Sequence, residues 1–172
     1  MNPFAWPFRA QFAFGFLACA ALLAYAIYSQ YQLFLDPCPL CIFQRVVFIV
    51  MGLVFLLGLL HGPRGWGRKV YGVLVFFVGM IGVGIAGRHV WLQHLPADEV
   101  PACGPGLEYM LQAFPMQKTL SMVFTGSGEC AKADWFFLGL SMPAWTLIWF
   151  AFLALGALWA GFRRRETANQ TS

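Results

Sequence analysis

The sequence predicts an all-α membrane protein, a single domain over residues 1–172 built as a bundle of four transmembrane helices. Three observations predict it: 60% of the 172 residues are hydrophobic, only 10% are charged, and the apolar residues gather in four long runs. Soluble domains carry about 25% charged residues, so this chain lacks the polar side chains to cover a globule in water. Its length also excludes a large soluble catalytic domain or a nucleic-acid-binding module.

The apolar runs cover residues 12–28, 42–60, 70–86 and 145–162. Each approaches the roughly 20 residues that a helix needs to cross about 30 Å of hydrocarbon. Such runs must be helical in a bilayer, because no water is there to satisfy the backbone. The third run contains Gly72, Gly79, Gly82 and Gly84, and small residues let transmembrane helices approach closely. We therefore expect the helices to pack as a bundle.

The basic residues indicate how the helices are oriented. They precede the first run, fill the connection 61–69 and follow the last run: Arg9, Arg64, Arg68, Lys69, Arg163, Arg164 and Arg165. The connections 29–41 and 89–143 are richer in acidic residues. Because cytoplasmic loops carry an excess of Lys and Arg, both termini are expected to be cytoplasmic and these two connections exported.

Two further segments need an interpretation. The first run is followed by no small-residue cleavage site, so it is expected to remain in the protein as a span. Within the long exported connection, 105–124 is apolar but interrupted by Pro115. It predicts a helix, broken or kinked, in the plane of the membrane interface. A helix that simply covers the bundle fits the same pattern equally well.

Four of the five cysteines lie in the exported connections. Cys19 is in the middle of the first run, where a thiol packs as a small hydrophobic group. Topology alone puts Cys38, Cys41, Cys103 and Cys130 on the same side of the membrane. In a bacterium that side is an oxidising compartment, in which disulfides persist.

Three interpretations of these four cysteines remain open. A structural zinc site usually has two C-x-x-C pairs, whereas Cys103 and Cys130 are far apart. A structural disulfide suits Cys103 with Cys130, because closing a long loop stabilises a fold. It suits Cys38 with Cys41 poorly, since the loop between them is very short. C-x-x-C is instead typical of dithiols that exchange disulfides.

The surroundings of the C-x-x-C pair favour the redox interpretation. Cys41 lies where the chain enters its second run, near a helix N-terminus whose dipole favours a thiolate. Arg45 follows four residues later on the same helix face. A guanidinium just inside hydrocarbon is costly unless it faces an anion or water, although snorkelling to the interface is its ordinary role. We expect Arg45 to face an anionic group.

A dithiol at the membrane boundary needs an electron acceptor, and the two-electron carrier of the lipid phase is a quinone. Its oxygens become anionic on reduction and need a hydrogen-bond donor such as Arg45. His89, at the outer end of the third run, and His94 are further candidates, although interfacial histidines are commonly just solvated. A haem requires two histidine ligands at the same depth in the membrane. Because His61 is on the opposite side, the histidines do not provide such a pair.

Together these motifs resemble the DsbB family of bacterial disulfide bond formation proteins. The resemblance covers about residues 12–162. It is carried by Cys38-Pro39-Leu40-Cys41 with Arg45, by HVWLQ at 89–93, by Cys103, by GECA at 128–131 with Trp135, and by FLGLSMPAW at 137–145.

The resemblance implies a protein-disulfide:quinone oxidoreductase of the bacterial inner membrane, with its redox-active loops in the periplasm. Such a protein reoxidises the soluble thiol oxidase DsbA and passes the electrons to ubiquinone or menaquinone, without a metal. Cys103 and Cys130 match the family's pair that faces DsbA, and Cys38 and Cys41 match the pair that faces the quinone.

The resemblance also assigns two residues to the quinone site. Arg45 matches its essential arginine, and His89 matches a histidine beside it. The chain departs from the best-known member in having Gln44 where an acidic residue precedes the arginine, so no proton-handling role is carried over to Gln44. Two alternatives stay open: a membrane scaffold whose loops are merely cross-linked, and an enzyme that runs a related relay on another thiol oxidase.

Overall fold

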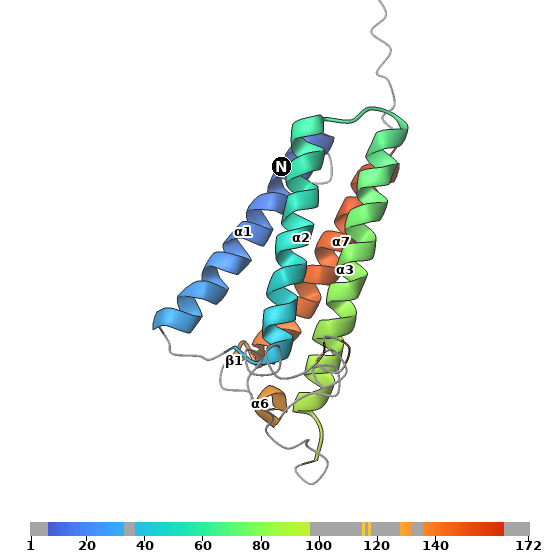
Figure 1. The fold of residues 1–172 in the computed structure, drawn as a ribbon. Helices are drawn as coiled ribbons and strands as arrows, with labels where there is room; N and C mark the ends of the chain where they lie inside the picture. The colour runs from blue at the N-terminus through green and yellow to red at the C-terminus, as the bar shows by residue number, and fades with distance from the viewer. Residues whose placement is uncertain are drawn as a thin grey trace, which may run out of the picture.

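Four long helices form the molecule (Figure 1). The structure, a computed structural model, describes residues 7–32, 37–96, 115, 117, 128–131 and 136–163. The long helices are α1 (Phe8–Gln32), α2 (Pro39–His61), α3 (Trp66–Gln93) and α7 (Met142–Phe162). All four are long and apolar enough to span a membrane, so the predicted fold is confirmed.

Each helix contains one predicted run and extends beyond it. The third run, 70–86, lies inside α3, which begins at Trp66 and continues to Gln93. Only the part in hydrocarbon must be apolar, and a helix can continue through the polar interface on either side. Large apolar side chains point outward along the helices, among them Leu17, Ile81 and Leu155, which are 63%, 59% and 60% exposed. Lipid would cover these faces.

Two small elements lie at the same end of the bundle as the start of α2 (Figure 1). One is the short helix α6 (Gly128–Ala131), and the other is a hairpin of β1 (Phe136–Phe137) and β2 (Leu140–Ser141). The hairpin turns through Leu138 and Gly139, whose φ angles are 52° and 78°. Positive φ at both positions is typical of the tightest hairpin turn, type I′. The amino-acid sequence alone does not predict this hairpin.

The opposite end of the bundle holds the start of α1, the connection between α2 and α3, and the end of α7 (Figure 1). This arrangement agrees with the predicted number of crossings. The predicted interfacial helix at 105–124 falls outside the described residues apart from Pro115 and Gln117, and the tail at 166–172 lies outside them altogether.

Glycines bring α3 and α7 together, and this is the most extensive helix contact in the bundle. A Cβ added at Gly72 would stand 2.8 Å from the carbonyl oxygen of Ala157 and 3.2 Å from the Cα of Gly161. At Gly79 it would stand 2.7 Å from the Cβ of Ala154. Small residues at such a seam let two backbones pack directly, as expected for helices in lipid.

Helix α1 is packed differently. It contacts mainly α2, and only 17% of its most apolar stretch is buried, against 33% for α3 and for α7. Figure 1 shows its C-terminal end leaning away from the other three helices. Cys19 is 1% exposed and part of the core, in agreement with its predicted packing role.

The glycine seam generates a stability prediction. Gly72→Ala should lower the stability of the folded protein by about 1–3 kcal/mol, because the new methyl group meets backbone that cannot rotate away. Thermal unfolding in detergent micelles measures the loss. Gly84→Ala is the matched control on the same helix, since an added Cβ there meets nothing within 4 Å. Equal melting temperatures for the two variants would contradict the packing argument.

Candidate redox site

The C-x-x-C motif forms the N-terminus of α2. Cys38 is the N-cap residue, and its Sγ accepts a hydrogen bond from the backbone N–H of Cys41 at 3.4 Å. Pro39 occupies the first turn, where a missing N–H costs nothing. The two sulfur atoms lie 3.1 Å apart, both as thiols. The local fold therefore presents the dithiol at a helix end, as the sequence predicted for Cys41.

A third thiol lies beside this pair. Cys130, on α6, is fully buried, and α6 packs against α3. The Sγ atoms of Cys130 and Cys38 and a ring nitrogen of His89 all lie within 4.8 Å of one another. The fold thus brings a cysteine of the long connection to the C-x-x-C pair. Cys103 lies outside the described residues.

The same cluster is a donor set for a soft cation. Two thiolates and an imidazole within 4.8 Å of one another are ligands that Zn²⁺ accepts. A bound cation would take up the sulfur lone pairs that disulfide exchange needs. Cys38, His89 and Cys130 therefore cannot bind a cation and support disulfide exchange at the same time.

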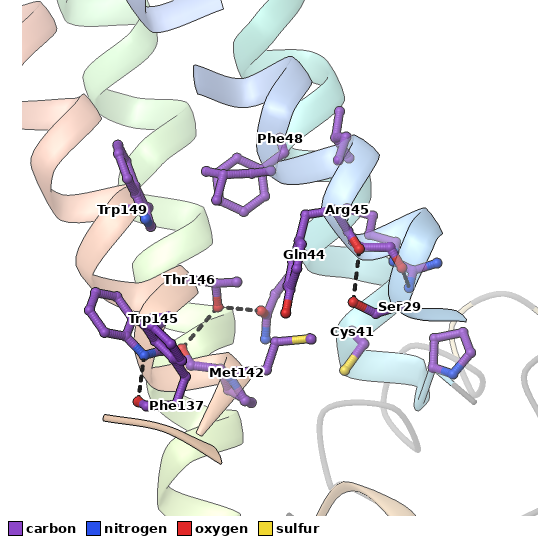
Figure 2. Close-up of a pocket in the computed structure, with 16 residues that line it drawn as sticks. Ser29, Cys41, Gln44, Arg45, Phe48, Phe137, Met142, Trp145, Thr146 and Trp149 are labelled. Carbon is purple, nitrogen blue, oxygen red and sulfur yellow. Dashed lines mark hydrogen bonds between the residues drawn. The ribbon is translucent and has the colours of Figure 1, made fainter. Parts of the chain in front are cut away.

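A cavity of about 480 Å³ adjoins the dithiol between α1, α2 and α7 (Figure 2). Its walls are mostly apolar and aromatic, with Phe48, Trp145 and Trp149 among them, and the hairpin contributes Phe137. The indole N–H of Trp145 donates to the backbone oxygen of Phe137 at 3.0 Å, which ties the hairpin to α7. Cys41 also lines the cavity. One sulfur of the dithiol therefore faces a space of the size that small-molecule sites have.

Arg45 lines the same cavity, one turn beyond Cys41. Its guanidinium donates to the side-chain oxygen of Gln30 at 2.6 Å and to the backbone oxygen of Ala26 at 3.1 Å. Both acceptors belong to α1, and Figure 2 shows Arg45 next to Ser29 of that helix. Arg45 thus links the leaning helix α1 to α2 and is also one of the residues that line the cavity.

His89 is 2% exposed and faces the dithiol. Its Nε2 lies 3.7 Å from the Sγ of Cys38, and its Nδ1 lies 3.1 Å from the side-chain nitrogen of Gln44. Gln44 in turn accepts a hydrogen bond from the hydroxyl of Thr146 at 2.6 Å. Cys41, Gln44, Arg45 and Thr146 are among the described residues that line the cavity, and His89 is not.

The structure places two residues whose roles the sequence leaves open. His94 is exposed at the end of α3, and its Nδ1 donates to the backbone oxygen of Val90 one turn back. The sequence assigns no role to Gln44, yet in the structure it lies buried in the polar cluster. A sequence signal existed for it: a glutamine inside an apolar run, three residues after Cys41, needs a buried partner.

The fold and the site together define a class, that of four-helix membrane proteins with a C-x-x-C dithiol at the end of a transmembrane helix. The chain belongs to the DsbB family, since the family model described as disulfide bond formation protein DsbB matches residues 8–160. The resemblance seen in the motifs is confirmed.

Relatives named disulfide bond formation protein B match most of the chain. The protein of Xanthomonas campestris pv. campestris strain 8004 is 58% identical over 166 residues, which cover 96% of each chain. The protein of Nitrosococcus oceani is 57% identical over 151 residues, covering 88% of this chain and 89% of the relative. The protein of Hahella chejuensis is 54% identical over 145 residues, covering 84% and 87%.

The closeness of Cys130 to Cys38 generates a cross-linking prediction. In a Cys41→Ser, Cys103→Ser double variant, mild oxidation should join most Cys130 to Cys38. Their sulfurs lie within 4.8 Å, and a modest shift brings them to the disulfide distance of about 2 Å. Mass spectrometry of unreduced peptides identifies the bridge. Cys19 is the internal control and should stay a thiol, so a Cys19–Cys130 bridge or an unlinked Cys130 would contradict the arrangement.

Proposed function

We propose that this protein is a membrane oxidoreductase that reoxidises a DsbA-like thiol oxidase and passes two electrons to a membrane quinone. One observation carries the proposal: the Sγ of Cys38 has two cysteine neighbours, since it lies 3.1 Å from the Sγ of Cys41, whose residue lines the cavity, and within 4.8 Å of the Sγ of Cys130. A thiolate attacks a disulfide sulfur through a mixed disulfide, so sulfurs in this order suit a stepwise relay.

The relay begins with the dithiol of the thiol oxidase. Its thiolate attacks Cys103 of a Cys103–Cys130 disulfide, which forms a mixed disulfide and releases Cys130 as a thiolate. Cys130 then attacks Cys38 of a Cys38–Cys41 disulfide and releases Cys41 as a thiolate. The second cysteine of the oxidase displaces Cys103, so the oxidase leaves with its own disulfide restored. Both electrons now reside in the cysteines of this chain.

The cavity residues fit a quinone head group. Aromatic and apolar walls suit its ring, and the Arg45 guanidinium supplies a hydrogen-bond donor for an oxygen that gains negative charge. When bound, ubiquinone or menaquinone would accept the two electrons released as Cys38 and Cys41 close their disulfide. Cys41 is the cysteine placed to deliver them, because it lines the cavity at the N-terminal end of α2.

Two pairs of cysteines are needed because the two substrates occupy different phases. A soluble oxidase does not enter lipid, and a quinone head group hardly leaves it. The basic residues near the opposite end of the bundle support a cytoplasmic location for that end. The thiol cluster would then face the periplasm of a bacterial inner membrane, where an oxidising poise is maintained kinetically through DsbA, DsbB and quinone, a system that is itself a standard example of this chemistry.

The cavity position of Arg45 generates a kinetic prediction. Arg45→Ala should raise the KM for a soluble quinone about ten- to a hundredfold, because a hydrogen bond to a charged group is lost. Quinone absorbance, followed with the purified variant and a reduced DsbA-like protein, measures this. Capture of a DsbA-like protein that lacks its second cysteine, as a mixed disulfide at Cys103, should be unchanged.

Arg88→Ala is the matched control. Arg88 has the same charge, lies near the same end of the bundle, and places its guanidinium over the ring of Trp91, 4.2 Å from its centre. It should leave the quinone KM unchanged. No quinone reduction by the unmodified protein would contradict the proposal and favour a cross-linked scaffold. Lost capture by Arg45→Ala with normal quinone kinetics would contradict the assigned roles.

A further inference from the structure

A line of hydrogen-bonding side chains runs from α7 through α2 and α3 to the dithiol. The hydroxyl of Thr146 donates to the Oε1 of Gln44 at 2.6 Å, and the Nε2 of Gln44 lies 3.1 Å from the Nδ1 of His89. The other ring nitrogen of His89 lies 3.7 Å from the Sγ of Cys38. Gln44 and His89 are 4% and 2% exposed. Buried polar atoms depend on one another for partners, so these contacts act together.

The Gln44 amide determines which nitrogen of His89 carries the proton. An amide nitrogen only donates hydrogen bonds, and in the structure the amide oxygen of Gln44 is turned toward the Thr146 hydroxyl at 2.6 Å. The single proton of that hydroxyl can go either to this oxygen or to the backbone oxygen of Pro143 at 2.9 Å. With the amide in this orientation the Nδ1 of His89 accepts, and a neutral imidazole then carries its single proton on Nε2. That N–H faces the sulfur of Cys38.

We propose that His89 donates a hydrogen bond to the Cys38 sulfur during disulfide exchange, and that Gln44 and Thr146 are positioning residues that hold His89 in the required tautomer. The contact differs from the one expected from the sequence, in which His89 donates to a quinone oxygen. In the structure the Nε2 of His89 is directed at Cys38, and the described cavity lining does not include the ring.

The step that this donation assists rests on the proposed function. To reset the relay, the thiolate of Cys103 attacks Cys130 in a Cys38–Cys130 disulfide. The Cys103–Cys130 bond forms, the Cys38–Cys130 bond breaks, and its electron pair stays on Cys38, which leaves as a thiolate. His89 donates a hydrogen bond to this sulfur and transfers no proton. Hydrogen bonds to an ionised acceptor are the strong ones, so the donation favours departure of Cys38.

A glutamine at position 44 suits this role better than a carboxylate. A carboxylate only accepts, so it would draw the imidazole proton to Nδ1 and leave Nε2 of a neutral ring as an acceptor. The amide does the opposite. Gln44 therefore makes His89 a donor to sulfur rather than a base for a thiol, which gives this residue a role that its family resemblance did not supply.

The first test reads the tautomer directly. Nitrogen-15 spectra of the imidazole in the reduced protein should show a protonated Nε2 and an unprotonated Nδ1 for His89 at neutral pH. Thr146→Val, which removes the hydroxyl but keeps the shape, should let the amide rotate and mix the tautomers. Thr146→Ser, which keeps the hydroxyl, is the matched control and should preserve the single tautomer.

The second test measures Cys38 itself, in a chain whose other four cysteines are replaced by serine, or by alanine at Cys19. Gln44→Met should slow alkylation of Cys38 at neutral pH about three- to tenfold, because the His89 ring no longer presents an N–H to the reacting sulfur. Thr146→Val should slow it in the same direction, and Thr146→Ser should not. The Thr146 pair keeps the test decisive even where Gln44→Met folds poorly.

The outcomes separate this inference from the proposed function, because neither test uses a quinone or a thiol oxidase. A protonated Nδ1 on His89, or alkylation rates that the Gln44 and Thr146 variants leave unchanged, would overturn the inference. The expected tautomer together with the expected slowing would support it. A protein that passes both tests but reduces no quinone would overturn the proposed function and leave the His89–Cys38 hydrogen bond in place.

Discussion

Every polar group that enters the hydrocarbon must find its partner within the protein, and the redox end of this bundle is organised by that requirement. Arg45 donates to two acceptors on α1, and Gln44 joins Thr146 of α7 to His89 of α3. Together these contacts link α2 to α1, α7 and α3. The polar residues that suit the chemistry thus also fix how four apolar helices meet around the dithiol.

The packing of the helices divides the bundle into a tight part and an open part. Glycines hold α3 against α7 at backbone distance, as at Gly72 and Gly161. Helix α1 has little buried surface and leans away, so a cavity forms between it and α7. The tight part positions His89 and Thr146 with respect to Cys38, while the open part provides the space that Cys41 faces.

The sequence predicted the parts of this arrangement that depend on local pattern. Apolar runs located the four helices, and the C-x-x-C motif placed Cys41 at a helix start. The approach of Cys130 to Cys38 follows from how α6 packs against α3, which no spacing along the chain encodes. The partners of Gln44 come from residues 45 and 102 positions away, so its role appeared only in three dimensions. The hairpin was missed because a pair of two-residue strands is too short for an alternating pattern.

The Sγ atom of Cys38 has two roles. It caps the first turn of α2 by accepting the N–H of Cys41, and in the proposed relay the same sulfur would change its covalent partner. A sulfur in a disulfide is a weaker acceptor than a thiolate, so the cap would be strongest when Cys38 is a thiolate and weaker when it is oxidised. In the proposed relay, the oxidation state of the protein would then be coupled to local fraying at one helix terminus, without any rearrangement of the spans.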